Sequence, residues 1–241
     1  MSSIHTLAGW RSAAKTPEVR TSADGDLAQP ARQLAWTRQE ETKLVQRVFL
    51  MKGPNSPRTV MFAGVEQDNG CPQVCLRAAH SLARLTDRSV CVVDADLRSP
   101  TLHTLVDAGA GAGLADAMAN PGAASSFARR LAPENLWLLT AGTVPDRESP
   151  VSMDRVHTCL DELRTRFEHV VINAPALDVW AESMAVSQFV DGVVLVLKAH
   201  VTRREIVRSL TTCLEDLNTP LLGVVLNDRT FPIPEGVYRL V

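Results

Sequence analysis

Several kinds of residue are scarce in the sequence, and each shortage excludes a class of protein. One tyrosine stands among 241 residues, and aromatic residues make up only 5% of the chain. No apolar run approaches the roughly 18 to 20 residues that a membrane-spanning helix needs, and the N-terminus has no apolar core typical of a signal peptide. We therefore expect a cytoplasmic protein with no membrane span of its own.

Excess charge and paired cysteines are also lacking. The 25 basic and 27 acidic residues give a net charge of −2, so no basic surplus favours nucleic acid or an anionic membrane as a partner. Cys71 and Cys75 have no second pair and no nearby histidine that would complete a zinc site. We expect reduced thiols, no metal cluster and no nucleic-acid partner.

Apolar segments recur at the spacing of an α/β protein. Residues 1–37 have little periodicity and are predicted to be a flexible leader, whereas 38–241 are predicted to form one domain that opens with a helix at 38–50. The expected strands are 59–64, 89–96, 136–142, 169–175, 191–199 and 221–227, and the main expected helices are 74–85, 151–167 and 203–217. Continuous Val, Leu and Ile runs are typical of strands covered on both faces. The fold class is therefore α/β, a doubly wound and mostly parallel sheet of the P-loop NTPase type.

The segment AGVEQDNGCPQ follows the first strand, where a P-loop would cradle phosphates with the pattern G-x-x-x-x-G-K-[ST]. With Gly70 as the second glycine, Cys71 replaces the lysine and Pro72 replaces the hydroxyl that contacts magnesium. Cys71 as a nucleophile is an alternative, but the sequence supplies no candidate base for it. The candidate nucleotide-binding residues of this degenerate site are Gly64, Gly70, Cys71, Pro72, Gln73, Asn173 and Asn227.

Acidic and amide residues follow the other strands. In parallel sheets ligands bind beyond the carboxyl ends of the strands, so Asp94 and Asp96 are candidate catalytic residues, with Asp94 as the ligand if Mg²⁺ binds. The alternative is that both carboxylates cap the next turn and pair with Arg98. Asn173 stands where a hydrolytic P-loop protein would carry aspartate, and we interpret it as a hydrogen-bonding residue that holds the loop.

The order of these motifs resembles that of the bacterial tyrosine kinases (BY-kinases) of capsule and exopolysaccharide systems, a branch of the MinD/ParA-type P-loop ATPases. The resemblance spans about 38–227 and includes CVVDADLRSPTLHTLV, GLADAM, INAPAL, FVDGVVLVLKAHVTRREIV and LLGVVLN. It implies that Cys91–Arg98 is a second Walker A-type motif, that Asn173 ends the Walker B strand and that Asn227 lies near the nucleotide base. It also implies docking to an inner-membrane polysaccharide co-polymerase, or chain-length protein, and the formation of a homo-oligomer.

The sequence departs from the family's pattern outside the loop as well. The family's assembly helix carries E-x2-R-x2-R, and the corresponding residues here are Glu40, Lys43 and Arg47, which we predict to form an interface. The family's kinases end in a tyrosine cluster, whereas this chain has Tyr238 alone, in FPIPEGVYRLV. We interpret this segment as a docked clasp and expect Tyr238 not to be an autophosphorylation site.

The missing lysine and magnesium contacts decide the expected activity. Their loss would cost about 4–6 kcal/mol of nucleotide binding, so only weak binding of ATP or ADP with Mg²⁺ is left open. The leading hypothesis is a catalytically impaired, kinase-like scaffold or regulator of exopolysaccharide synthesis and export. An active tyrosine autokinase with an unusual loop and a ParA/MinD-like positioning ATPase are the alternatives.

Overall fold

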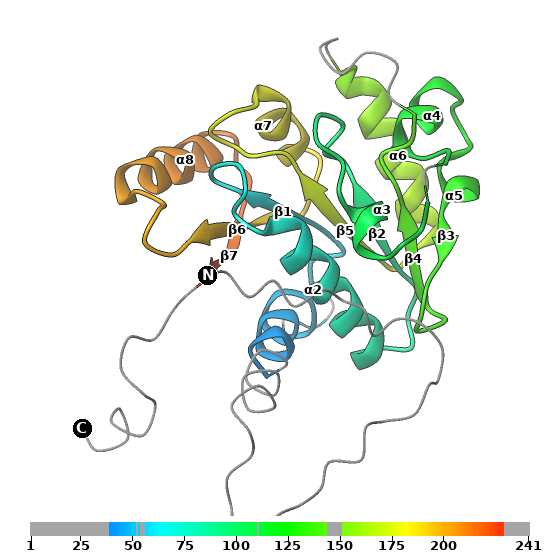
Figure 1. Ribbon diagram of the computed structural model, residues 1–241, viewed down its shortest axis with the longest axis horizontal. Coiled ribbons are helices and arrows are strands. Elements are labelled where there is room, and N and C mark those ends of the chain that lie inside the picture. Colours follow the sequence, from blue (N-terminus) through cyan, green and yellow to red (C-terminus); the bar gives the residue numbers. More distant parts are fainter. Residues whose placement is uncertain (1–38, 52, 54–55, 110, 144–150, 229–241) are drawn as a thin grey trace, which may run out of the picture.

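Seven strands form one sheet in the computed structural model, which describes residues 39–51, 53, 56–109, 111–143 and 151–228 (Figure 1). Their order across the sheet is β3-β4-β2-β5-β1-β6-β7, and every neighbouring pair is parallel except β3 with β4. The strands are β1 (Thr59–Gly64), β2 (Val90–Asp94), β3 (Arg129–Arg130), β4 (Leu136–Leu139), β5 (His169–Ala174), β6 (Gly192–Lys198) and β7 (Leu221–Asn227). This arrangement confirms the predicted fold class.

Helices cover both faces of the sheet and divide the apolar core into two layers. One layer lies beneath η1, α2 and α3, and the other beneath α4, α6, α7 and α8. The helices are η1 (Gln46–Leu50), α2 (Cys71–Leu85), α3 (Leu102–Leu105), α4 (Leu114–Ala119), α5 (Ala124–Phe127), α6 (Met153–Arg166), α7 (Ala181–Ser187) and α8 (Arg204–Asp216). Each central strand is therefore buried on both faces, as its continuous apolar sequence predicts.

The predicted strands agree with the structure to within two or three residues at their ends, and 59–64 and 221–227 agree without any shift. The sequence pattern missed β3 and the short helices α3, α4, α5 and α7. Each of these elements has seven residues or fewer, which is too short for a period of 3.6 or 2 to stand out. The missed elements pack at the ends of strands and do not change the topology.

The first helix lies beside α2 and covers the same apolar layer of the sheet (Figure 1). Its described part is α-helical over 39–45 and continues as the π-helical turn η1. Val45, Val48 and Phe49 are buried, while Glu41 pairs with Arg77 of α2 at 2.8 Å. The helix expected at 38–50 is therefore present, whereas the predicted leader 1–37 and Tyr238 lie outside the described residues.

The two edge strands differ in how well they are protected from further pairing. β3 has two residues, both arginine, and a short, charged edge resists pairing with another strand. β7 has seven residues and no charge, and Val224 and Leu226 are 49% and 50% exposed. Asn227 at the end of β7 lies beside the loop that follows β1, so this edge belongs to the site described below.

No helix within the described ranges is both long enough and apolar enough to cross a membrane.

Packing of α2 on the sheet can be tested with two leucines of the same helix. Leu76 is fully buried, so Leu76→Ala should lower the free energy of unfolding by about 2–5 kcal/mol through lost contacts and a residual cavity. Leu85, which is 41% exposed, is the control, and Leu85→Ala should cost less than about 1 kcal/mol. Urea unfolding measures both changes. Equal losses would contradict the described packing of α2.

Candidate functional site

The carboxyl ends of five parallel strands meet at one edge of the sheet and bring the predicted site residues to it. Gly64 ends β1, Asp94 ends β2, and Asn227 ends β7. Asn173, near the end of β5, pairs in register with Asp94, and Lys198 of β6 pairs with Asn227. A parallel sheet places ligands beyond this edge, so these ends define the candidate site.

The loop between β1 and α2 bends sharply at two residues. Asp68 has φ 55° and Gly70 has φ 77°, and both values lie in the left-handed region. Gly70 is the N-cap of α2, and Val74 N–H donates to Gly70 O (3.1 Å) to start the helix. The loop therefore turns back over the N-terminus of a 15-residue helix, where unpaired backbone N–H groups favour an anion.

The side chain of Asn69 fills the interior of this loop. Cys71 N–H donates to Asn69 Oδ1 (2.7 Å), and Asn69 Nδ2 donates to Glu66 O. Asn69 is 4% exposed, and a Cβ added to Gly64 would overlap its amide. Gly64 is thus needed because its missing side chain leaves the space that Asn69 occupies.

Residues at the ends of β6 and β7 hold the loop from outside. Lys198 Nζ donates to Asp68 O (3.0 Å), and Asn227 Nδ2 donates to Asn69 O (2.9 Å). A Cβ on Gly70 would overlap the Asn227 amide, so this glycine permits the close approach. Thr202, just beyond β6, donates to Glu66. The loop is therefore bound to the sheet by protein side chains at three points.

Cys71 is the first residue of α2 and is buried in the apolar layer beneath that helix. It is 3% exposed, and burial, together with the charges of Asp96 and Asp94, raises the pKa of its thiol well above the usual range. A thiol with a raised pKa is a poor nucleophile, which argues against the nucleophile alternative. Pro72 and Gln73, the other two predicted residues of the motif, are half-buried in the first turn of α2.

Asp94 is fully buried, and its carboxylate oxygens accept hydrogen bonds from the turn that follows β2. Oδ2 accepts Thr101 N–H (3.0 Å) and Leu102 N–H (2.9 Å). Oδ1 accepts Asn173 Nδ2 (3.0 Å) and Asp96 N–H (3.3 Å). The turn-capping alternative from the sequence matches these contacts, because four donors already surround the carboxylate.

In the buried pair formed by Asp94 and Asn173, only Asp94 can carry a charge. Burial raises the pKa of Asp94 from 3.8 to about 6, although hydrogen bonds from Asn173 and Leu102 act in the opposite direction. An aspartate at position 173 would bring a second carboxylate against Asp94, whereas the Asn173 amide donates a hydrogen bond to it. Asn173 Oδ1 is buried without a hydrogen-bond partner among the described residues. Asn173 therefore hydrogen-bonds the residue that ends β2, and the interpretation that it holds the loop stays a prediction.

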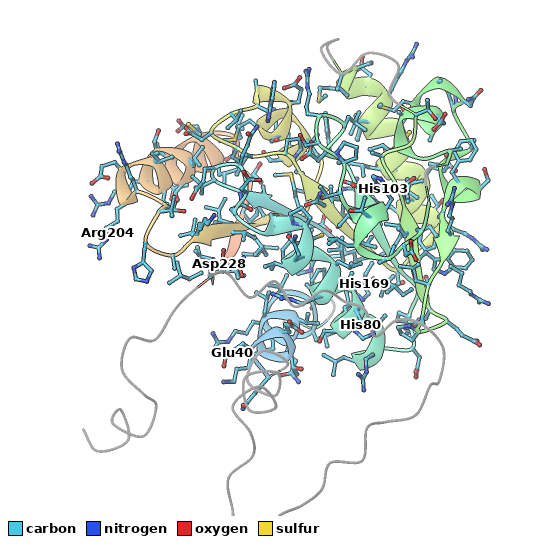
Figure 2. All side chains as sticks on the ribbon, in the orientation of Figure 1. Glu40, His80, His103, His169, Arg204 and Asp228 are labelled. Carbon is cyan, nitrogen blue, oxygen red and sulfur yellow. The ribbon has the colours of Figure 1, made fainter. Side chains whose placement is uncertain are left out.

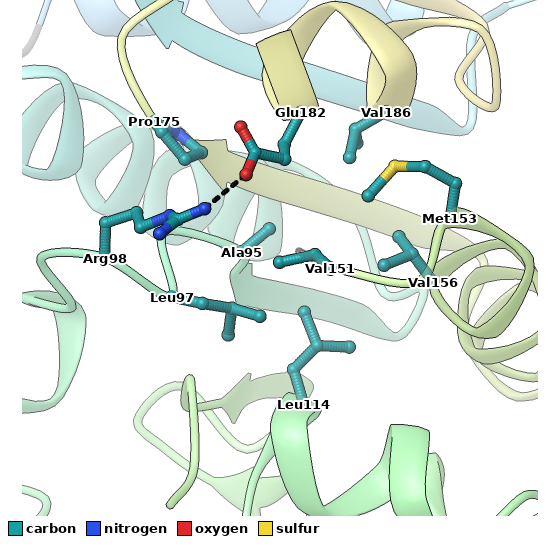
Figure 3. A pocket seen from close by; sticks show the side chains of 10 residues that line it. All are labelled: Ala95, Leu97, Arg98, Leu114, Val151, Met153, Val156, Pro175, Glu182 and Val186. Atoms are coloured by element: carbon teal, nitrogen blue, oxygen red, sulfur yellow. Dashed lines mark hydrogen bonds and ion pairs between the residues drawn. The ribbon is translucent and has the colours of Figure 1, made fainter. Parts of the chain in front are cut away.

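Asp96 and Arg98 stabilise the same turn on its outer side. Asp96 Oδ1 accepts Arg98 N–H (3.1 Å) and Ser99 N–H (2.8 Å). Figure 3 shows the Arg98 guanidinium meeting Glu182 of α7 at the rim of a small, largely apolar pocket. Arg98 Cζ also lies 4.7 Å from the ring centre of Trp180. Burial would raise the pKa of Glu182, but the hydrogen bond and charge of Arg98 leave it lowered. The turn is thus fastened to α7.

Four contributors to the site were missed from the sequence, namely Asn69, Lys198, Thr202 and Glu182. Asn69 immediately precedes the second motif glycine, and its position within a tight loop was the available signal, because Asn often hydrogen-bonds nearby backbone. The other three lie more than 80 residues from their partners along the chain. Only the folded sheet brings such residues together.

The predicted interface residues lie on the solvent side of the first helix. Glu40, Lys43 and Arg47 are exposed, and Lys43 pairs with Glu40 at 2.8 Å. Figure 2 shows Glu40 on this helix, away from Arg204 on α8. The exposed position leaves these residues accessible to a partner, and their role as an interface stays a prediction.

No group of three or more His, Cys, Asp or Glu side chains in the described part of the chain is arranged to hold a metal ion.

Sequence comparison connects the chain to bacterial tyrosine-protein kinases and to a succinoglycan biosynthesis transport protein, although no family model matches it. CapB of Staphylococcus aureus is 28% identical over 137 residues, which cover 56% of this chain and 60% of CapB. Tyrosine-protein kinase wzc of Salmonella typhi is 25% identical over 179 residues, 74% of this chain and 24% of wzc. Succinoglycan biosynthesis transport protein ExoP of Rhizobium meliloti is 23% identical and covered over 23% of its length. The chain thus spans less than two thirds of each of these relatives.

Several solved structures superpose on this chain and have a similar fold. The chimerical protein CapA2B2 superposes with a TM-score of 0.72 at 20% identity, covering 80% of this chain and 85% of that one. The kinase domain of Escherichia coli ETK gives 0.66 at 22% identity, covering 76% and 73%. MinD of Pyrococcus horikoshii, complexed with Mg-ADP, gives 0.62 at 18% identity, covering 76% and 77%.

These likenesses define first a class and then a narrower group. The class is the P-loop NTPase fold of the MinD and ParA type, with a mostly parallel sheet between two layers of helices. Within it, the sequence relatives of this chain are bacterial tyrosine kinases and an exopolysaccharide transport protein.

The raised pKa of Asp94 predicts how the free energy of unfolding depends on pH. Because the folded-state pKa of about 6 exceeds the unfolded value of 3.8, the folded protein binds a proton more tightly between them. The contribution of Asp94 to stability is therefore complete below the unfolded pKa and is lost as pH rises through about 6.

Asp94→Asn removes this titration. The free energy of unfolding of the wild type minus that of the variant should rise by up to roughly 3 kcal/mol as pH falls from about 7 to 4. Urea unfolding at several pH values measures it. Burial lowers the pKa of His169, which weakens the fold in acid, but His169 is present in both proteins and cancels in the difference. A difference that stays constant with pH would contradict the buried, titrating carboxylate.

Proposed function

We propose that this protein is a kinase-like scaffold or regulator of exopolysaccharide or capsule synthesis and export, with little or no nucleotide turnover. The observation that carries the proposal is the filled loop, in which Asn69 occupies the interior and Cys71 N–H already has an acceptor. We further propose that the chain acts by binding an inner-membrane polysaccharide co-polymerase. The name of ExoP, a succinoglycan biosynthesis transport protein, supports the process, and the names of CapB and wzc support the likeness to tyrosine kinases.

The side chains at the loop argue against strong binding of a nucleotide. Cys71 stands at the position of the phosphate-binding lysine and is buried, and Pro72 supplies neither a hydroxyl nor an N–H. Hydrogen bonds to charged groups contribute about 1.5–3 kcal/mol each. Without them, and with Asn69 inside the loop, we infer that the residues present do not fit a tightly held ATP.

Magnesium has a similarly poor fit at Asp94. A Mg²⁺ site needs oxygen ligands in near-octahedral geometry and usually retains several waters. Asp94 is fully buried and surrounded by four hydrogen-bond donors, and its neighbour Asn173 presents an amide N–H to it. We infer that Asp94 and Asp96 act here on the backbone of the turn, and that a metal-dependent phosphoryl transfer is not their role.

One observation favours the alternative of an active ATP-dependent tyrosine autokinase. Lys198 Nζ lies 3.0 Å from Asp68 O, so a cation from β6 reaches the loop although the loop has no lysine of its own. In that function Lys198 would stabilise the charge on transferred phosphate, and Asp94 and Asp96 would lie at the same edge of the sheet. The nucleotide experiment below separates the two functions.

The partner surface that we propose is the exposed face of the first helix. Glu40, Lys43 and Arg47 carry charges on this face, at the position that resembles the family's assembly helix. The buried side of the same helix is fixed to the domain by Val45, Phe49 and the Glu41–Arg77 ion pair. A rigidly docked helix with a charged outer face is suited to bind a partner, or a second copy of this chain, without changing the core.

Nucleotide affinity is the direct test of the proposed function. Calorimetric titration of the full chain with Mg-ATP should give a dissociation constant of about 1 mM or weaker, because the lysine and hydroxyl contacts are missing. The E. coli ETK kinase domain, a tyrosine kinase domain of similar fold, is the positive control. Low-micromolar binding by this chain would overturn the scaffold proposal and favour the autokinase.

Cellular polysaccharide output tests the proposed division between chemistry and binding. Charge reversal by Lys43→Glu with Arg47→Glu should lower output severalfold, because it changes the proposed partner surface. Asp96→Ala should leave output within about twofold of the wild type at equal protein abundance.

The control for charge reversal is Arg203→Glu with Arg204→Glu, which alters exposed arginines at the start of α8. That variant should behave like the wild type. Loss of output in Asp96→Ala, together with normal output in the Lys43 and Arg47 variant, would favour the active enzyme.

A further inference from the structure

We propose that Asn69 is an internal plug that competes with phosphate for the loop between β1 and α2, so that this residue controls whether a diphosphate group can enter. The inference rests on the proposed function, since it concerns the same loop, and it adds a cause of weak binding that is separate from the missing lysine. The cause is occupation of the loop by the protein's own side chain.

The plug uses the donor that an anion would use. In phosphate loops the first backbone N–H groups of the following helix point at the ligand. Here Cys71 N–H, the first of α2, donates to Asn69 Oδ1 at 2.7 Å. The amide oxygen thus stands in for a phosphate oxygen. Because one N–H cannot serve both acceptors at full strength, binding of an anion requires Asn69 Oδ1 to leave.

The plug also takes the volume that an anion would take. Asn69 is 4% exposed, and its amide lies where a Cβ of Gly64 would be. The nitrogen of the same amide donates to Glu66 O on the opposite side of the loop. The Asn69 amide therefore contacts both sides of the loop. A phosphate group and this amide cannot occupy the loop interior together.

The backbone of the loop is held independently of the plug. Lys198 Nζ and Asn227 Nδ2 donate to the carbonyls of Asp68 and Asn69, and both donors come from the ends of neighbouring strands. Removing the side chain of residue 69 leaves these two hydrogen bonds intact, because they involve main-chain oxygens. The cradle should therefore keep its shape when the plug is shortened, and Lys198 then supplies a nearby cation for the anion.

Inorganic pyrophosphate is the probe, because it carries the phosphate chemistry without the nucleoside. We compare the wild type, Asn69→Ala and Asn69→Leu, each also in a background with Cys71→Lys and Pro72→Ser that restores the missing groups. Alanine empties the loop, whereas leucine fills the same volume with no hydrogen-bonding group. Both variants lose the hydrogen bonds of the amide, so any loosening from that loss is shared.

Affinity for pyrophosphate should rise about 10-fold or more in Asn69→Ala relative to its parent, since the anion no longer displaces two hydrogen bonds and a side chain. Asn69→Leu should stay as weak as its parent. Circular dichroism and thermal unfolding confirm that each variant is folded before titration.

Two results would overturn the plug. One is an Asn69→Ala variant that gains no affinity even in the background that carries Cys71→Lys and Pro72→Ser. The other is an equal gain in Asn69→Leu and Asn69→Ala, which would trace the effect to a loosened loop. The ratio of variant to parent affinity for pyrophosphate tests the plug. The proposed function is read from the Mg-ATP affinity of the wild type, so either can fail while the other holds.

Discussion

The hydrogen bond from Cys71 N–H to Asn69 Oδ1 is the contact on which the filling of the loop at the candidate site depends. It satisfies the first N–H of α2 from within the chain, so the helix needs no ligand to cap it. It also places the Asn69 side chain over Gly64 and leaves the main-chain carbonyls of the loop for Lys198 and Asn227. The side chain of Asn69 thus lies between β1 and α2, while main-chain carbonyls of the same loop accept hydrogen bonds from β6 and β7.

A second polar contact, between Asp94 and Asn173, follows the same logic at the neighbouring strands. Both residues are fully buried and face each other in the paired register of β2 and β5. An amide beside a buried carboxylate lowers the cost of burying its charge, because it donates a hydrogen bond without adding a second negative charge. Amide side chains therefore contact the ends of β1, β2 and β5.

The distinction between fold and site is sharp in this protein. The likeness to CapA2B2 and MinD covers about three quarters or more of the chain, with TM-scores of 0.72 and 0.62. A sheet of this kind is maintained by its buried apolar residues, which do not depend on ligand chemistry. A few side chains at the strand ends can therefore change while the architecture stays. At the pocket beside Arg98 and Glu182, an ion pair and apolar contacts join the turn after β2 to α7.

Sequence by itself determined the parallel sheet, the boundaries of its long strands to within a few residues, and the residues at the carboxyl ends. Strong apolar runs are readable because burial on both faces demands them. It also located the loop and its missing lysine, because these are consecutive residues.

Tertiary structure decided what those residues do. Asn69 was readable as a turn residue, but its role as the filling of the loop depends on the space over Gly64. Lys198, Asn227 and Glu182 gained their roles from partners more than 80 residues away. The four donors to Asp94 come from both the following turn and β5, so only the fold shows that they surround one carboxylate. A sequence orders residues along one dimension, whereas a parallel sheet brings separate strand ends to one edge, and hydrogen bonds form only there.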